Sequence, residues 1–150
     1  MPLLAGMRLT AQRLNWLRPE VYSATGTADL TVTSTTTLIP GCEIVITTGA
    51  GARVIADGAA TFLIGTTTAA NSFVSVQLVV DGATQPSFGR WGETTAGAQN
   101  TPSQQWDLTS LAAGSHTIQL AAARTSPGTG SMTAVGANSR LVLSVLEQIV

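Results

Sequence analysis

The sequence is short of charge and contains no lysine. Only 10% of its 150 residues are charged, and the seven cationic residues, all arginine, leave a formal net charge of −1. Without a basic patch the chain lacks the electrostatic footprint that nucleic-acid binding needs, so we expect no nucleic-acid partner. An average soluble domain carries about 25% charged residues. We therefore expect part of this weakly charged surface to be covered by another chain.

Cysteine, histidine and long apolar runs are also scarce. Cys42 is the only cysteine, which excludes a disulfide within the chain, and His116 is the only histidine. A zinc site within one chain would lack its usual ligands, unless a threefold axis brought three copies of His116 together, so we expect no metal and no cofactor. No segment approaches the about 20 apolar residues of a membrane-spanning helix, and the first residues lack the features of a secretory signal. These absences predict no membrane partner and synthesis in a cytoplasm.

No catalytic motif stands out. Asp107 and Ser115 are close to His116 in the sequence, but no nucleophile-elbow pattern surrounds the serine. The glycine runs at 49–51 and 126–130 lack the lysine and the helix that follow a phosphate-binding loop. The chain has enough carboxylates to supply the pair that a glycosidase needs, but they lie in predicted loops and turns. We expect a protein that is not an enzyme.

Helical periodicity is confined to the first 20 residues. Thr10 is a suitable N-cap, Leu9 and Leu14 are spaced for a hydrophobic staple, and Pro19 ends the helix. A helix of about two turns is marginal alone, so its stability must come from packing on its own domain or on another chain. We interpret residues 1–20 as an anchoring arm. Its contacts are predicted at apolar residues: Leu3, Leu4, Leu9, Leu14, Trp16 and Leu17.

From Val21 onwards the pattern changes to a period of two, which predicts short strands separated by turns. Turns are predicted at 39–41, 57–58 and 81–82, and exposed loops at 93–101 and 126–130. About eight to ten strands without a second helix predict an all-β fold, a jelly-roll-like β-sandwich over residues 21–150. The predicted strands cover residues 29–37, 42–48, 53–56, 60–66, 72–80, 85–91, 103–108, 115–123 and 139–147.

The last predicted strand is apolar on both faces, since Leu141, Leu143 and Val145 alternate with Val142, Ser144 and Leu146. Such a strand is either central in a sandwich or has its outer face against another subunit. The weakly charged surface favours a homo-oligomer. We predict a subunit interface formed by Leu141, Leu143, Val145 and Leu146.

Two tryptophans, Trp91 and Trp106, flank the predicted loop 93–101. Aromatic side chains beside loops can stack on sugars, so both are candidate contacts for a host-surface glycan. The competing interpretation places them in the core, where tryptophan is more common in a sandwich of this size.

Four short motifs carry a resemblance to a known group of proteins. They are Met-Pro-Leu-x-Ala-Gly-x-Arg-Leu-Thr-Ala-x-Arg-Leu-Asn at 1–15, Ile-Pro-Gly at 39–41, Val-Asp-Gly at 80–82 and Ala-Gly-Ser-His-Thr at 113–117. Together they resemble a small minor structural protein of actinobacterial tailed phages. The later motifs also resemble jelly-roll heads of the C1q/TNF-like kind, in which an apolar last strand lies near a threefold axis. The resemblance implies a non-enzymatic, homotrimeric virion protein, although the chain has no coiled-coil or triple-helical shaft.

Two positions in the virion stay open at this point. A minor tail protein would contact the host through loops 93–101 and 126–130, whereas a capsid decoration (cement) protein would grip the shell through residues 1–20. We predict the tail, with capsid decoration as the alternative and a soluble carbohydrate-binding module as the alternative from a different class. The predicted partners are further copies of the chain, other virion proteins bound through residues 1–20, and a host-surface glycan.

Overall fold

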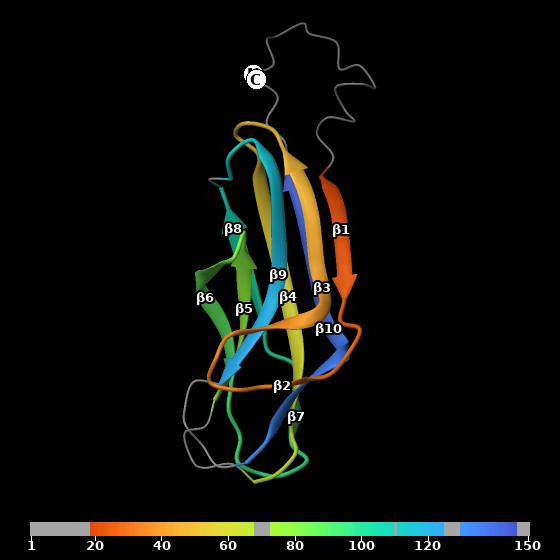
Figure 1. Ribbon diagram of the computed structural model, residues 1–150, viewed down its shortest axis with the longest axis vertical. Coiled ribbons are helices and arrows are strands. Elements are labelled where there is room, and N and C mark those ends of the chain that lie inside the picture. Colours follow the sequence, from red (N-terminus) through yellow and green to blue (C-terminus); the bar gives the residue numbers. More distant parts are fainter. Residues whose placement is uncertain (1–18, 68–72, 110, 125–129, 147–150) are drawn as a thin grey trace, which may run out of the picture.

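The computed structural model describes residues 19–67, 73–109, 111–124 and 130–146, and the predicted arm helix lies outside these ranges. Every regular element within them is a strand (Figure 1). The strands are β1 (Glu20–Thr25), β2 (Leu30–Thr31), β3 (Thr37–Thr48), β4 (Arg53–Ile64), β5 (Val74–Val80), β6 (Ala83–Trp91), β7 (Gln99–Asn100), β8 (Ser103–Leu108), β9 (Gly114–Arg124) and β10 (Met132–Leu146).

The strands form two antiparallel sheets. The first has the order β1-β10-β4-β7, with β2 also paired to β10 and β8 paired to β4, and the second has the order β3-β9-β5-β6. In Figure 1 the strands β3 and β9 lie in front of β10 and β4, so the two sheets stack as the layers of a sandwich. The prediction of an all-β sandwich is therefore confirmed for the described residues.

The core lies between the sheets and follows from the period of two along each strand. On β10 the side chains of Leu141, Leu143 and Val145 are buried, while their neighbours in the sequence point outwards. On β3 the alternate residues Ile44 and Ile46 are buried as well. Burial of such side chains contributes about 1.5–3 kcal/mol each, which makes the core the main source of stability. Its largest fully buried members are Phe62, Ile64, Leu78, Ile118, Leu120, Met132, Leu141 and Leu143.

The hairpin predicted at Asp81-Gly82 is present between β5 and β6. Both turn residues have positive φ, 50° at Asp81 and 82° at Gly82, as a type I′ turn requires. Pro86 predicts an edge or a bulge, since proline cannot donate to a sheet ladder. The strand β6 lies at the edge of its sheet, and its register with β5 shifts between Gln77 and Val79. The sequence therefore determines this hairpin locally.

The turn predicted at Asp57-Gly58 is wrong, because β4 runs without a break from Arg53 to Ile64. Gly58 lies in the middle of the sheet, between Leu141 of β10 and Gln104 of β8. A Cβ atom at this position would clash with the side chain of Leu120 and come within 2.8 Å of the Trp106 ring. The glycine makes room for core side chains and does not reverse the chain.

The predicted strand 29–37 and turn 39–41 are also corrected. Within this range Leu30–Thr31 forms β2 and Thr37 begins β3. Between them the chain crosses from one sheet to the other: the Val32 N–H donates to the Met132 carbonyl at 2.9 Å, and the Arg124 N–H donates to the Thr33 carbonyl at 2.7 Å. Residues 39–41 lie inside β3, whose register with β9 shifts between Leu38 and Glu43. The residues that the sequence predicts as a turn therefore form a bulge in β3, with Gly41 at a φ of 84°.

The last strand begins earlier than predicted, at Met132, and contains a register shift between Val135 and Arg140. Its end pairs with the start of β1, since Val145 lies opposite Glu20. The two ends of the described domain therefore lie side by side, at the upper end in Figure 1. Across the described residues we find no helix with the length and apolar character to cross a membrane.

Candidate functional site

The predicted subunit interface needs correction. The side chains of Leu141, Leu143 and Val145 are buried between the two sheets, so they cannot touch a second copy of the chain. They are buried because this face of β10 packs against β3 and β9 of the second sheet. Leu146 is partly exposed on the outer face, so of the predicted residues it alone stays available for an interface.

The two predicted ligand contacts, Trp91 and Trp106, have different environments in the structure. Trp106 is 5% exposed within the core, and its indole N–H donates to the Ser87 carbonyl at 2.7 Å. It cannot stack on a sugar in this position, so its assignment as a ligand contact is wrong. Trp91 is partly buried against the core at the end of β6 and stays a candidate. The predicted anchor residues, Leu3, Leu4, Leu9, Leu14, Trp16 and Leu17, lie outside the described residues.

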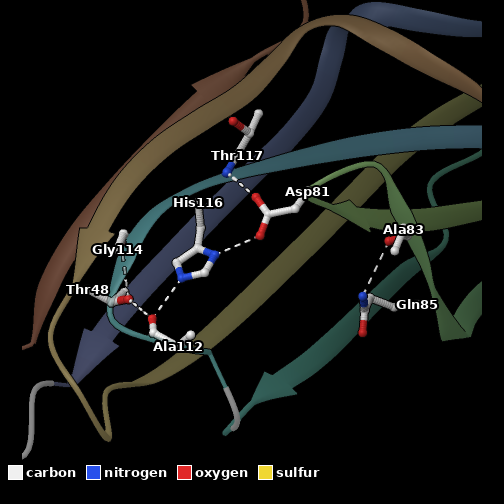
Figure 2. A network of polar contacts seen from close by, with 8 residues as sticks. All are labelled: Thr48, Asp81, Ala83, Gln85, Ala112, Gly114, His116 and Thr117. Atoms are coloured by element: carbon white, nitrogen blue, oxygen red, sulfur yellow. Dashed lines mark hydrogen bonds and ion pairs between the residues drawn. The ribbon is translucent and has the colours of Figure 1, made fainter.

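A polar cluster that the sequence did not predict joins three segments at one end of the sandwich (Figure 2). Asp81 is in the β5–β6 turn, His116 is the third residue of β9, and Ala112 precedes β9. His116 Nδ1 lies 2.7 Å from Asp81 Oδ2, and Nε2 lies 2.8 Å from the Ala112 carbonyl oxygen. The Thr117 N–H donates to Asp81 Oδ1 at 2.8 Å, and Thr48 Oγ1 donates to the Ala112 carbonyl at 2.8 Å.

Both imidazole nitrogens of His116 face acceptors, an arrangement that only the doubly protonated ring satisfies with two donors. The hydrogen bond to Asp81, helped by the one to the Ala112 carbonyl, accordingly raises the pKa of His116. The same bond from His116, with the Thr117 N–H, lowers the pKa of the Asp81 carboxyl. The cluster thus favours a charged pair, with the histidine buried and the carboxylate half exposed.

The pair has the histidine and carboxylate of a hydrolase triad, but its geometry serves a different purpose. In a triad one imidazole nitrogen must be free to take a proton from a nucleophile, and here the nitrogen away from Asp81 is bound to the Ala112 carbonyl. Ser115 is exposed and points to the opposite side of β9 from His116. The arrangement ties the β5–β6 turn to the start of β9.

The cluster predicts that stability depends on pH. Because the pKa of folded His116 is raised, its contribution is complete below about pH 6.5, the pKa of an unfolded histidine, and is lost as the pH rises through the folded-state pKa. Because the pKa of Asp81 is lowered, its contribution is present above about pH 3.9 and is lost as the pH falls through the lower value.

We therefore expect His116→Gln to lower the free energy of unfolding by about 1 kcal/mol between about pH 4 and 6.5, a modest value because Asp81 is half exposed. The difference between the two proteins should shrink towards pH 9. Urea unfolding at a series of pH values measures this. A difference that stays constant from pH 5 to pH 9 would show that the imidazolium does not stabilise the fold.

The thiol of Cys42 is buried beside the β3 bulge, where it donates to the Ser139 carbonyl at 3.5 Å. Burial raises its pKa to about 11. A thiol that stays protonated at neutral pH is a poor nucleophile, so Cys42 has a packing role. In the described ranges no three residues among His, Cys, Asp and Glu are grouped to hold a metal ion.

A groove of about 430 Å³ lies on the outer face of the first sheet, over β4, β8 and β10. Asp57 and Arg140 are the charged residues of its lining, and the other lining residues are neutral. The amide of Gln105 donates to Asp57 Oδ1 at 2.8 Å. Beside it, Arg53 and Asp107 form a two-pronged ion pair between β4 and β8. Ala59 and Val142 are apolar residues of its lining, which also contains the polar residues Ser103, Gln104 and Gln105.

Comparisons with known proteins show what this chain is similar to in fold. No protein-family model matches it, and no match is found among curated proteins. Among solved structures it is similar to Eiger TNF from S. frugiperda, with a TM-score of 0.54 and 11% identity over 89% of this chain and 96% of that one. The likeness shows a TNF-like jelly-roll fold, consistent with the sandwich described above.

Two further solved structures overlap the chain less closely. One is from infectious bursal disease virus, Gt strain, with a TM-score of 0.48 and 14% identity over 87% of this chain and 33% of that one. The other is dimeric latent PorU from Porphyromonas gingivalis, with a TM-score of 0.49 and 10% identity over 85% of this chain and 13% of that one. The chain thus spans a third or less of each of these proteins.

Proposed function

We propose that the protein is a non-enzymatic structural component of a tailed-phage virion, a homotrimeric β-sandwich attached through residues 1–20 and associated with the tail. The motifs at 1–15 and 113–117 support the phage origin through their resemblance to minor structural proteins of such phages. The TNF-like fold supports the jelly-roll head that the same resemblance implies. The weakly charged surface supports contacts with other chains.

The observation that carries the tail assignment is the distance between Glu20, where residues 1–20 join the sandwich, and the exposed loop before β7. Residues 1–20 join the sandwich at Glu20, the first residue of β1, which pairs with Val145 of β10. The next residue of β10, Leu146, pairs with Arg53 at the start of β4, so the junction lies at this end of β4. The loop that precedes β7 lies at the other end of β4, where Leu63 pairs with Gln99 and the Gly97 N–H donates to the Ile64 carbonyl at 2.8 Å. Ten residues of strand separate these ends by roughly 30 Å.

The distal loop has a defined shape. Glu93 Oε1 accepts hydrogen bonds from the N–H groups of Thr94 and Thr95, at 2.7 and 3.3 Å, and these bonds lower the pKa of the Glu93 carboxyl. Residues 92–97 are exposed, and all but Glu93 are small. An attachment at one end and an exposed, shaped loop at the other suit a head that is held by the virion and contacts a host surface.

Immunogold labelling of purified virions with antibody against the β-sandwich tests the location. We expect label at the tail only. Label over the whole shell would replace the tail assignment by capsid decoration, and no label on virions that carry every other structural protein would contradict the virion role itself.

A further inference from the structure

The outer face of the first sheet carries charges of both signs in a small area. On β10, β4 and β8 the side chains alternate with buried core residues, so Arg140, Asp57 and Asp107 point outwards. Arg53 and Asp107 are already paired with each other. The remaining charges of the groove are therefore one guanidinium, at Arg140, and one carboxylate, at Asp57.

These two charges lie near one another but are not joined. In the register of β4 and β10, Arg140 is opposite Ala59 and Asp57 is opposite Val142, which places them diagonally across the two strands. No ion pair links them, and within the described ranges the Arg140 guanidinium has no hydrogen-bond or ion-pair partner. The Asp57 carboxylate is held by a single neutral amide, that of Gln105, through Oδ1.

We propose that this groove is the contact between copies of the chain, with Arg140 of one copy bound to Asp57 of the next. The inference rests on the homotrimer of the proposed function and names the surface that forms it. A guanidinium fits a carboxylate through two parallel hydrogen bonds, and both groups are exposed in the single chain. Around a threefold axis Arg140 of each copy faces Asp57 of the next, so one charge of each sign per copy makes three such pairs and closes the ring.

The surrounding residues favour a second copy over a sugar. The outward positions next to the pair are partly exposed aliphatic side chains, Ile55, Val142 and Leu146, and Val21 on the adjacent β1 is 62% exposed. No aromatic ring lines the groove on which a sugar could stack. Interfaces between subunits combine an apolar patch with a few paired charges in this way.

The opposite sheet supplies a matched control. On its outer face Glu43 of β3 accepts a hydrogen bond from the amide of Gln119 at 2.6 Å, which repeats the Asp57–Gln105 arrangement. Glu43→Arg and Asp57→Arg therefore make the same change of charge beside the same kind of amide. Only the second change alters the proposed contact.

Analytical ultracentrifugation of the full chain over a range of concentrations tests the proposal. We expect Asp57→Arg and Arg140→Asp each to raise the concentration needed for assembly by about tenfold or more, because each places like charges across the contact. The double variant with both changes should recover most of that loss, and Glu43→Arg should assemble like the unaltered chain. Thermal unfolding of each variant separates loss of the contact from loss of folding. The milder variant Arg140→Gln is measured for the same purpose.

The outcomes distinguish this inference from the function on which it rests. An unaltered chain that stays monomeric at every concentration would contradict the homotrimer and the contact together. A chain that assembles, and whose assembly is insensitive to changes at Asp57 and Arg140 or equally sensitive to Glu43→Arg, would overturn the proposed contact alone. In that case a sugar titration of the assembled protein would show whether the groove binds glycan instead.

Discussion

Replacing Trp106 with alanine is expected to lower the free energy of unfolding by about 3–5 kcal/mol, the usual cost of removing a large aromatic side chain from a core. The ring is buried, it lies against the position where Gly58 leaves space, and its N–H is bonded to the Ser87 carbonyl. A domain of this size has a total stability of about 5–15 kcal/mol, so the loss is a large fraction of it. Urea unfolding of the purified variant measures the change.

Trp91→Ala is the matched control, because this side chain is only partly buried at the edge strand β6. We expect a clearly smaller loss of stability from it. If Trp106→Ala kept the stability of the unaltered protein but lost binding to a glycan, Trp106 would be a ligand contact after all. That result would favour the carbohydrate-binding module over the virion role.

Deleting residues 1–18 is expected to leave the sandwich folded while incorporation into virions falls to background. The deletion stops before β1, so every strand pair of the described domain is retained. Incorporation is expected to fail because we assign attachment to residues 1–20. Unfolding curves of the truncated protein and its amount in purified virions, relative to the unaltered chain, measure the two effects.

Glu43→Gln, a neutral change on the outer face of the second sheet, serves as the control and should be incorporated normally. Normal incorporation of the truncated chain would show that attachment is made by the sandwich. Loss of folding on truncation would show that the arm belongs to the domain, which is the other interpretation of a helix too short to stand alone.

The features of the fold that depend on neighbouring residues could be predicted from the sequence. The Asp81-Gly82 turn, the edge position of Pro86 and the inward side chains of Ile44 and Ile46 follow from local backbone preference and a period of two. Gly58 and Gly41 look like turn signals for the same reason. In the structure Gly58 leaves room for the Trp106 and Leu120 side chains, and Gly41 lies in a bulge. Both roles depend on residues far away in the sequence, so neighbouring residues do not reveal them.

The polar cluster and the groove could not be predicted for a related reason. Asp81 and His116 are 35 residues apart and meet only because β5 pairs with β9, so the sequence indicates only a turn at Asp81. Arg140 and Asp57 come together through the pairing of β10 with β4, whose register shift places Arg140 opposite Ala59. Alternation predicts that β10 is apolar on both faces, but only the packing of the second sheet against it shows which face is core.

A reconstruction of the virion by electron cryomicroscopy tests the central claim most directly. The account predicts density for the β-sandwich on the tail, in groups of three, with the end that holds Glu20 and Val145 against the particle and the loop before β7 pointing outwards. Sandwich density spread over the capsid shell, or a virion that lacks the sandwich altogether, would contradict it.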